Sequence, residues 1–552
     1  MQAQGELRRI PYTSPKTALP ADWDPFLDLL VVCGRGAEDD FSDWESGARI
    51  VFFLPQDSPR AVPRRQARTA AELGEVLLAQ RGAMPRRAKV LRCDDPWADD
   101  RRVREVAEML REVLTAKQLQ ANTIQRSGSG WLENALGNAG VAARRPSVAA
   151  LRDRFAGRPA VLVSPGPSLT KNVEQLARLG DKALLISGTH SLSILAKHGI
   201  TPDLVIGLDA GDLERHWVGL RPEDVPALAF SVSCEPEYFA SLGERVFGFS
   251  SNADVDGWLY RAMGDDATLR SGGSVACAAL SLAARMGCDP IVFVGQDLSF
   301  PDGRFYAAGG VDGDARVESN ADGSFFLKKP SGADGPGVAV DGGVRFTRDQ
   351  QQLQVPAYGG EGVVPTSAAL HSFLIWFHGA CRGLGADRVW NCTEGGARIE
   401  HTRELPLADA LATWSAAERP FASELEDVVQ TAGRDASTRA ATLRSFLAGQ
   451  LEALAPAVEA ARRCKQLCRE VARGAAELAA LGRAEQELKV RLAPLTLLSI
   501  YGQRDIAEAT LAGREARSLE QSLAASEVLF DVVLRNAQRF EDVVRKAHAD
   551  VS

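Results

Sequence analysis

Ala160-Val-Leu-Val-Ser164 is the first of six short apolar runs that follow one another between residues 160 and 295. The other five are Ala183-Leu-Leu-Ile-Ser187, Leu204-Val-Ile-Gly-Leu208, Ala227-Leu-Ala-Phe230, Val246-Phe-Gly-Phe249 and Ile291-Val-Phe-Val-Gly295. Continuous apolar runs are typical of strands that are buried on both faces, as in a parallel sheet covered by helices. The pattern therefore predicts an α/β protein whose central domain is an open, mostly parallel, Rossmann-like sheet.

Each run stops at a short polar cluster that contains Gly, Ser, Thr, Asp or Gln. The clusters occupy residues 165–168, 188–190, 209–212, 231–233, 250–252 and 296–297. In open parallel sheets, ligands bind outside the carboxyl ends of the strands, at the point where the strand order reverses. The clusters therefore predict a ligand site at this edge of the sheet.

Composition restricts the class of protein. A chain of 552 residues predicts about three domains, and 45% hydrophobic with 25% charged residues is typical of a soluble globular protein. A net charge of −8 does not favour nucleic acid as a partner. The chain start lacks the apolar segment of a secretory signal, and no stretch approaches the ~20 apolar residues of a membrane helix. Nine scattered cysteines indicate reduced thiols, so we expect a cytoplasmic protein with no membrane partner.

Three further regions surround the predicted central domain of residues 159–404. Two apolar runs and a helix near 101–117 predict a small α/β accessory domain over residues 1–120, and residues 121–158 are interpreted as a helical bridge. Residues 405–552 show apolar positions at helical spacing, with Pro456 and Pro494 expected to mark kinks or breaks. We expect a helical bundle there that serves packing, partner binding or homo-oligomer formation.

Two segments inside the central domain have a different character from the apolar runs. Residues 301–355 are rich in Gly, Asp and Ser, which is typical of a lid, a short hairpin or a disordered insertion. Residues 366–380 return to an apolar helix, and residues 388–392 predict a last strand. His371 and His378 flank that helix and are interpreted as partly buried structural residues.

A turn follows the first central strand and precedes a predicted helix at residues 171–179. It reads Ser164-Pro-Gly-Pro-Ser-Leu-Thr170. Backbone N–H groups at a helix start bind phosphate without a basic side chain. Ser168 either adds a hydroxyl to such a site or caps the helix. The turn matches neither the Walker A loop nor the dinucleotide-binding glycine motif.

A second helix start lies farther along the chain. Residues 271–286 form a glycine turn followed by a helix of small residues, which can pack closely on the sheet. The free N–H groups and the positive end of the helix dipole point toward the expected site.

Acids and bases at the strand ends are the candidates for chemistry. Asp209 and Asp212 can hold a divalent metal, orient a ribose or accept a proton, or they can be a cap and a solvated residue. Asp297 is either functional or a buried acceptor of N–H groups. His190 is either a general base or a hydrogen-bonding residue of a crowded turn. No zinc-site or serine-hydrolase motif is present in the sequence.

Five motifs occur in an order that resembles a known family. They are Gly166-Pro-Ser-Leu169, the run from Gly199 to Asp209, Gly273-Ser-Val275, Gly295-Gln-Asp-Leu298 and Gly395-Gly-Ala-Arg-Ile399. Together they resemble the motility accessory factor (Maf) proteins, which are bacterial flagellin glycosyltransferases with a sialyltransferase-like central domain. The resemblance covers roughly residues 120–400.

The resemblance implies transfer of a nonulosonic (sialic-acid-like) sugar, pseudaminic or legionaminic acid, from its CMP-activated form to Ser or Thr of flagellin or another surface protein. Carried over by position, it implies that one set of residues cradles the nucleotide: Gly166, Pro167, Ser168, Gly188, Thr189, Asp209, Gly272, Gly273 and Ser274. Gln296 and Asp297 would line the sugar side. The general base stays open among His190, Asp297 and Tyr306. No metal or other cofactor is required, because the leaving group is a monophosphate.

Two other functions fit the same domain. The sequence also resembles archaeal 6-hydroxymethyl-dihydropterin pyrophosphokinases, whose chemistry would need Mg²⁺ held by Asp209, Asp212 and Asp297. A catalytically inactive nucleotide-binding scaffold for flagellar or surface assembly is the third interpretation. The carboxyl-terminal helical region favours the glycosyltransferase, because it suits a protein acceptor better than a small substrate.

Overall fold

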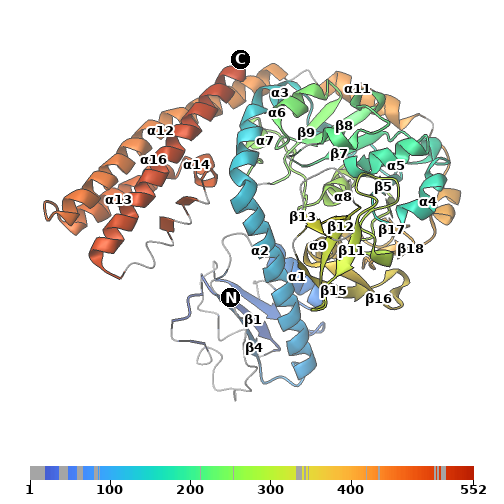
Figure 1. Cartoon of the computed structure of the whole chain (residues 1–552), viewed down its shortest axis with the longest axis horizontal. Coiled ribbons are helices and arrows are strands. Elements are labelled where there is room, and N and C mark those ends of the chain that lie inside the picture. Colours follow the sequence, from blue (N-terminus) through green and yellow to red (C-terminus); the bar gives the residue numbers. More distant parts are fainter. Residues whose placement is uncertain are drawn as a thin grey trace. The chain divides into compact units, whose positions relative to one another are not determined.

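The structure is a computed structural model in which the chain divides into two compact units (Figure 1). One unit comprises residues 1–121 with 368–384, and the other comprises residues 122–367 with 385–552. The structure describes residues 19–551 except 21, 26, 36–40, 42–47, 59–65, 80–84, 86, 210, 212, 253, 331–337, 341–342, 346, 348, 418, 433–435, 503–504, 507–508 and 511–516.

The first unit contains a four-stranded parallel sheet in the order β3-β2-β1-β4. Its elements are β1 (Leu29–Cys33), β2 (Ile50–Phe53), β3 (Gln66–Ala67), α1 (Ala70–Ala79), β4 (Ala88–Arg92), the start of α2 (Asp100–Gly137) and α9 (Ala368–Leu384). The two strands predicted from apolar runs are present and fully buried. Helix α9, the apolar helix predicted at 366–380, packs against α1 in this unit.

The second unit contains an eight-stranded sheet in which every pair of neighbouring strands is parallel. Its order is β18-β17-β10-β5-β6-β7-β8-β9. The strands are β5 (Ala160–Val163), β6 (Leu184–Gly188), β7 (Leu204–Gly207), β8 (Ala227–Ser231), β9 (Val246–Phe249), β10 (Ile291–Val294), β17 (Val389–Asn391) and β18 (Arg403–Glu404). The six apolar runs therefore form the predicted parallel sheet, and the predicted last strand is β17.

The strand order reverses at β5. From β5 the chain adds β6, β7, β8 and β9 on one side, and it then crosses to place β10, β17 and β18 on the other. The reversal point between β5 and β10 is the place where ligands bind in sheets of this class. The carboxyl ends of β5, β10 and β6 therefore frame the expected site.

Helices cover the faces of this sheet, as expected for strands buried on both sides. They are α3 (Ala139–Arg144), α4 (Leu169–Leu176), α5 (Leu192–Lys197), α6 (Pro236–Ser241), α7 (Trp258–Ala262) and α8 (Val275–Arg285). Helix α8 packs across β5, β6, β7 and β10. Its small buried residues, among them Ala278 and Ala283, let its backbone approach the sheet closely.

The Gly-, Asp- and Ser-rich insertion begins with a 3₁₀ turn (Pro301–Gly303) and further turns, and antiparallel strands follow from Arg316 onward. They are β11 (Arg316–Ser319), β12 (Ser324–Lys329), β13 (Val338–Val340), β14 (Gly343–Arg345), β15 (Gln350–Pro356) and β16 (Val363–Ser367). The sheet order is β13-β14-β12-β15-β16, with β11 pairing with β12. Of the three possibilities expected for this segment, hairpins describe it best.

The remainder of the chain is helical, as predicted. It contains α10 (Leu407–Ala412), α11 (Phe421–Ala432), α12 (Ala436–Ala472), α13 (Leu478–Leu492), α14 (Thr496–Ile500) and α16 (Leu519–Asp550). Helix α12 packs along both α16 and α13 (Figure 1). It continues through Pro456 without a break, whereas Pro494 lies between α13 and α14.

The beginning of the helical region is part of the packing around the central sheet. Leu407 and Leu411 of α10 are buried in the same core cluster as strands β5 and β10. Phe421 at the start of α11 packs on Phe155, with 5.6 Å between ring centroids. Phe446 of α12 stacks on Trp258 of α7. Sheet and helical region therefore share one compact unit.

No helix within the described ranges combines the length and the apolar character needed to cross a membrane.

Candidate functional site

Asp297 and Ser168 join the two strands at the reversal point of the sheet. The backbone N–H of Ser168 donates to Asp297 Oδ2 at 3.0 Å, and its hydroxyl donates to Asp297 Oδ1 at 2.6 Å. A Cβ on Gly166 would collide with the same carboxylate. Asp297, which follows β10, is therefore seated at the start of α4, where its charge interacts favourably with the helix dipole.

The other amides of this turn are also engaged within the chain. Gly166 N–H donates to the Gly295 carbonyl at 2.9 Å, and Pro165 and Pro167 have no N–H group. Asp297 is 2% exposed, and its burial raises the pKa of this carboxyl to about 6, against the opposing effect of its bonds to Ser168. The carboxylate thus occupies the place where a ligand phosphate was expected.

Gln296 is held in the same way. The hydroxyl of Ser164 donates to Gln296 Oε1 at 2.5 Å, and the Gln296 N–H donates to the Thr393 hydroxyl at 3.1 Å. These contacts tie the ends of β5, β10 and β17 together. The structure thus brings the sequence-predicted Ser168, Gln296 and Asp297 together, in a buried network.

Two more of the polar strand-end clusters serve a buried acid. Asp256 is fully buried, and it accepts hydrogen bonds from Ser233 at 2.7 Å, from Ser250 at 2.6 Å and from both the backbone and the hydroxyl of Ser251 at 3.0 Å. The serines at the ends of β8 and β9 are thereby committed to one carboxylate. Their role is to fix the loops at this end of the sheet.

The ends of β6 and β7 carry functional groups with capacity for a ligand. His190 lies in a 3₁₀ turn (Thr189–Ser191) after β6, and its ring contacts that of His216, with 3.9 Å between centroids and 41° between the ring planes. His216 lies in a second 3₁₀ turn (Glu214–His216) after β7, and the Tyr306 ring lies 5.7 Å from His190. Asp209 is exposed directly after β7. The structure therefore groups His190, Tyr306 and Asp209 with His216.

Charges around His190 act in opposite directions. Burial lowers the pKa of His190, Asp209 and Asp312 raise it, and Arg215 lowers it, with a net lowering from 6.5. Burial likewise raises the pKa of the Tyr306 phenol far above its usual range. At neutral pH, His190 is therefore a neutral imidazole that can accept a proton, whereas Tyr306 keeps its proton and can donate a hydrogen bond.

The amino end of α8 lies beside this group. A Cβ built on Gly188 at the end of β6 would lie 3.3 Å from Val275 Cγ1 in the first turn of α8. Gly272 and Gly273 adopt φ values of 52° and 87°, which glycine accommodates without strain. Ser274 caps the helix by accepting from the Ala276 N–H. The Ser274 N–H donates to the Ser271 carbonyl at 2.7 Å, whereas the Val275 N–H has no acceptor among the described residues. That N–H group and the positive end of the helix dipole make this helix start suited to an anion.

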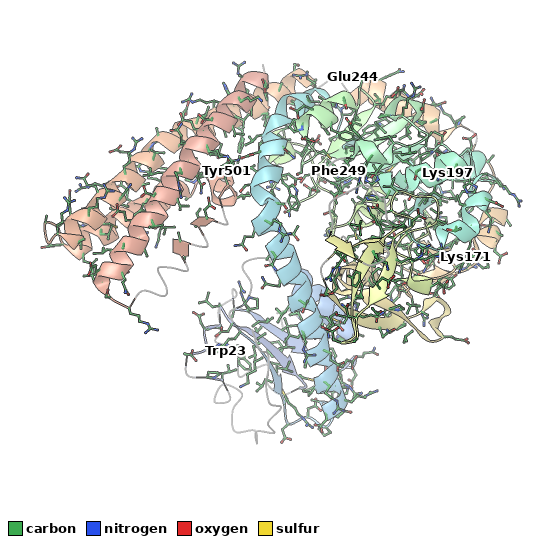
Figure 2. The ribbon with its side chains drawn as sticks, in the orientation of Figure 1. Trp23, Lys171, Lys197, Glu244, Phe249 and Tyr501 are labelled. Carbon is green, nitrogen blue, oxygen red and sulfur yellow. The ribbon has the colours of Figure 1, made fainter. Side chains whose placement is uncertain are left out.

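The loop that carries Tyr306 is anchored on three sides. The Ala307 N–H donates to the Pro165 carbonyl at 2.9 Å, and Lys197, labelled in Figure 2, donates to the Gly309 carbonyl at 2.7 Å. Lys329 of β12 pairs with Asp312 at 2.5 Å. The hairpin insertion therefore fixes the loop that covers His190.

The magnesium ligands expected for a kinase are not brought together. Asp209 follows β7 and Asp297 follows β10, and β5 and β6 lie between these strands. Three strand spacings place their backbones about 14 Å apart, too far for one ion. Asp212 lies outside the described residues. In the described part of the chain, no cluster of three or more His, Cys, Asp or Glu side chains could hold a metal ion.

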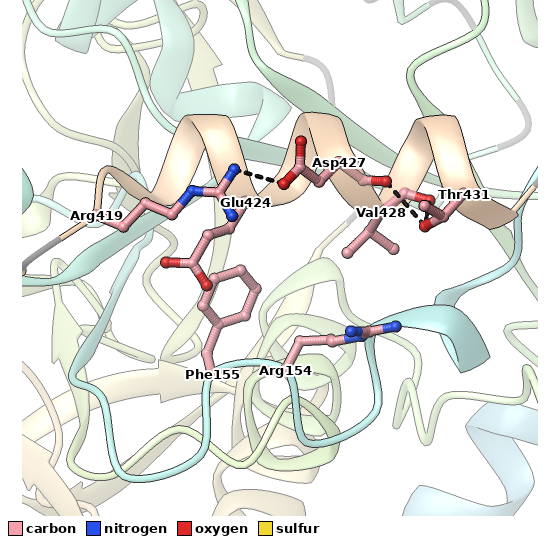
Figure 3. Close-up of a pocket in the computed structure, with 7 residues that line it drawn as sticks. All are labelled: Arg154, Phe155, Arg419, Glu424, Asp427, Val428 and Thr431. Atoms are coloured by element: carbon pink, nitrogen blue, oxygen red, sulfur yellow. Dashed lines mark hydrogen bonds and ion pairs between the residues drawn. The ribbon is translucent and has the colours of Figure 1, made fainter.

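A pocket of about 380 Å³ lies at the opposite edge of the sheet (Figure 3). It is lined by Arg154, Phe155, Arg419, Glu424, Asp427, Val428 and Thr431. Phe155 precedes β5, so the pocket lies near the amino ends of the strands. In Figure 3, Arg419 is paired with Asp427 along α11. This pocket contains none of the predicted site residues.

Three residues at this end of the sheet were not singled out from the sequence. Arg215 and His216 follow β7 within ten residues, as strand-end loops of a parallel sheet require, but nothing in their spacing distinguishes them. Asp256 was also missed, although it follows Ser250-Ser251-Asn252 closely.

The two histidines interpreted from the sequence as structural residues, His371 and His378, lie on α9, in the other compact unit.

Comparison with known families identifies the central part of the chain. Residues 133–303 match the family model described as 6-hydroxymethylpterin diphosphokinase MptE-like. The chain therefore contains an MptE-like domain. This confirms the pterin-pyrophosphokinase-like central domain expected from the sequence. The match begins in α2 and ends just after β10, so the MptE-like domain contains six strands of the sheet, together with His190, Arg215 and α8.

One solved structure with similarity to this chain is that of a Maf glycosyltransferase from Magnetospirillum magneticum AMB-1. The two sequences are 14% identical, the alignment covers 95% of this chain and 77% of that chain, and the TM-score is 0.45. Comparison with curated protein sequences gave no match.

Proposed function

We propose that this protein is a glycosyltransferase that moves a nonulosonic sugar from a CMP-activated donor to a Ser or Thr hydroxyl of flagellin or another surface protein. The proposal is supported by the ordered sequence motifs, by the MptE-like domain and by the groups at the ends of β6 and β7. The helical region from α10 onward supplies surface for a protein acceptor.

One observation carries the proposal: a neutral imidazole stands beside a helix start. Burial lowers the pKa of His190. The first turn of α8 lies next to Gly188, which precedes His190 by two residues. Transfer from a nucleotide-activated sugar to a hydroxyl needs a proton acceptor at the hydroxyl and a group that stabilises the departing phosphate. The position of His190 and of the first turn of α8 at one edge of the sheet supports these two roles.

In the proposed reaction, the oxygen of the acceptor hydroxyl bonds to the anomeric carbon of the sugar, and His190 takes the proton of that hydroxyl. The bond from that carbon to the CMP phosphate breaks, and the phosphate leaves with the bonding electron pair. N–H groups at the start of α8 stabilise the resulting charge. Tyr306 stays protonated and donates a hydrogen bond. Asp209 accepts a hydrogen bond from the ribose.

Ligand binding and turnover test the proposal together. Thermal unfolding is followed with CMP, with CMP-N-acetylneuraminic acid and with ATP plus Mg²⁺, and transfer is followed by the mass increase of purified flagellin. Stabilisation by the cytidine ligands and an increase by one sugar residue are expected. Stabilisation without any transfer would instead indicate the inactive scaffold.

A second candidate is a 6-hydroxymethylpterin pyrophosphokinase, because the matching family model carries that description. It requires Mg²⁺ ligands, and Asp209 and Asp297 lie at the ends of strands that are not neighbours. Stabilisation by ATP plus Mg²⁺ but not by CMP, with pyrophosphate transfer to the pterin, would establish this activity in place of the glycosyltransferase.

A further inference from the structure

Arg215 is an exposed arginine at the edge of the group formed by His190, His216 and Tyr306. Its Nε–H donates to His216 Nε2 at 3.3 Å, which orients the guanidinium and requires Nε2 of His216 to be unprotonated. In the described ranges, no carboxylate lies within ion-pair distance of Arg215. Its terminal N–H groups are therefore available to a ligand.

Other arginines around the same sheet are fixed by acceptors of the chain. Arg145 donates to the carbonyls of Phe239 and Ala240, and Arg285 pairs with Asp266. Those two side chains stabilise the fold, because their N–H groups are bound to acceptors of the chain itself. Arg215 differs because its single hydrogen bond leaves one side of a planar donor group exposed beside the proposed base.

We propose that Arg215 binds the carboxylate of the donor sugar and thereby selects acidic sugars over neutral ones. This inference rests on the proposed glycosyltransferase function. A guanidinium pairs with a carboxylate through two parallel N–H···O bonds, a geometry that a lysine cannot reproduce. The ligand class is a nucleotide-activated sugar acid rather than a neutral hexose.

The position of Arg215 agrees with the chemistry of such donors. In a nonulosonic acid the carboxylate is attached directly to the anomeric carbon, the atom that the acceptor oxygen attacks. Its binding group must therefore stand close to the base that activates the acceptor. Arg215 meets this requirement, because it donates a hydrogen bond to His216 and the centroid of the His216 ring lies 3.9 Å from that of His190.

The charges of the site also favour one bound carboxylate. Asp209 and Asp312 are the acidic groups that act on both His190 and Tyr306, and Arg215 is the cation that acts on both. Asp312 is already paired with Lys329. A ligand carboxylate at Arg215 would therefore meet an uncompensated guanidinium rather than an existing ion pair.

A matched pair of ligands tests the assignment. Binding of CMP, of CMP-N-acetylneuraminic acid and of its carboxyl methyl ester is measured by titration calorimetry on the full-length protein. Wild-type protein is expected to bind the acid about tenfold to a hundredfold more tightly than the ester, the range expected for a charge-assisted pair. Arg215→Gln is expected to abolish that preference and to leave CMP binding unchanged, and Arg215→Lys to restore it only in part.

Arg178→Gln is the control, because Arg178 is an exposed arginine near the end of α4, away from the site. An Arg215→Gln protein that still prefers the acid would overturn the assignment of Arg215 while leaving the glycosyltransferase standing. A wild-type protein that binds neither CMP nor either sugar nucleotide would overturn the proposed function and this inference with it.

Discussion

Burial lowers the pKa of His190 more than Asp209 and Asp312 raise it, so its ring is neutral at neutral pH. Replacing it with alanine removes the proposed proton acceptor but none of the groups at the start of α8. We expect His190→Ala to lower the transfer rate by about 10²–10⁴-fold and to leave the Kd for CMP within twofold. Steady-state kinetics with flagellin and titration with CMP measure the two effects.

Because the pKa of His190 is lowered from 6.5, solvent protons convert the ring to its charged form, which cannot act as a base, only below that pH. The wild-type rate should therefore fall on the acid side of pH 6.5. His198→Ala is the matched control, since His198 is an exposed histidine eight residues farther along the chain. Unchanged kinetics in the His190 variant would place the base elsewhere.

Asp297 has a structural role, because its carboxylate holds the Ser168 turn at the start of α4. Its pKa is raised from 3.8 to about 6, so between these pH values the folded chain binds more protons than the unfolded chain. The free energy of unfolding should then fall by roughly 2–3 kcal/mol from this group alone as the pH rises from 4 to 6. The Asp297→Asn variant has no titrating carboxyl at this position, but its side-chain amide oxygen can still accept the hydrogen bond from the Ser168 N–H.

Urea denaturation of both proteins from pH 4 to 7 tests this expectation. The stability of the variant relative to wild type should increase across the window, and CMP binding at pH 7 should persist. Asp203, whose pKa is also raised to about 6, is present in both proteins and cancels. A difference between the two proteins that does not change with pH would rule out a buried, titrating Asp297.

At the scale of elements, the glycine turn before α8 is the feature most specific to the site. Gly273→Ala forces an L side chain to φ 87° and should cost about 1–2 kcal/mol. It also displaces the first-turn N–H groups, so CMP binding should weaken at least tenfold. Thermal unfolding and CMP titration measure the two effects separately.

Gly264→Ala is the control for backbone strain. Gly264 has a φ of 75° and open space around its Cα, and it lies in the turn after α7. It should lose similar stability and bind CMP as wild type does. Equal weakening of CMP binding in both variants would mean that the turn before α8 has no special relation to the ligand.

The elements also show what sequence could and could not predict. The six central strands were predictable because both of their faces are buried, which demands continuous apolar runs. Strands β11 and β12 were not, because partly exposed strands in a Gly- and Asp-rich segment carry no such run. Helix α2 joins the helix predicted near 101–117 to the predicted helical bridge in one element that continues through Ser127-Gly-Ser-Gly130, a continuity that the sequence did not predict.

Only part of the site could be predicted from the sequence, because its geometry depends on the order of the strands in the sheet. Each strand-end cluster was visible in the sequence, but which clusters face one another depends on strand order. Placing β10 beside β5 seats Asp297 on the Ser168 amide, and this contact changes the expected use of that turn. Arg215 and His216 became visible only when their loop was placed beside His190.

At the scale of the whole molecule, the helical region cannot be removed without loss of core. Leu407 and Leu411 pack in the cluster that contains Val161 and Val292, and each buried leucine lost costs about 2–5 kcal/mol. A chain that ends at residue 404 should therefore lose cooperative unfolding and CMP binding together. Thermal unfolding of the purified fragment with and without CMP is the test, and a fragment that folds and binds normally would contradict it.

A crystal structure of the protein with CMP bound would test most directly whether the nucleotide binds at the ends of β6 and β7. The phosphate should accept a hydrogen bond from the Val275 N–H at the start of α8, with the open side of the phosphate toward His190. The Ser168 amide should stay on Asp297. A phosphate seated at residues 165–168, or a nucleotide bound away from the ends of β6 and β7, would contradict the account.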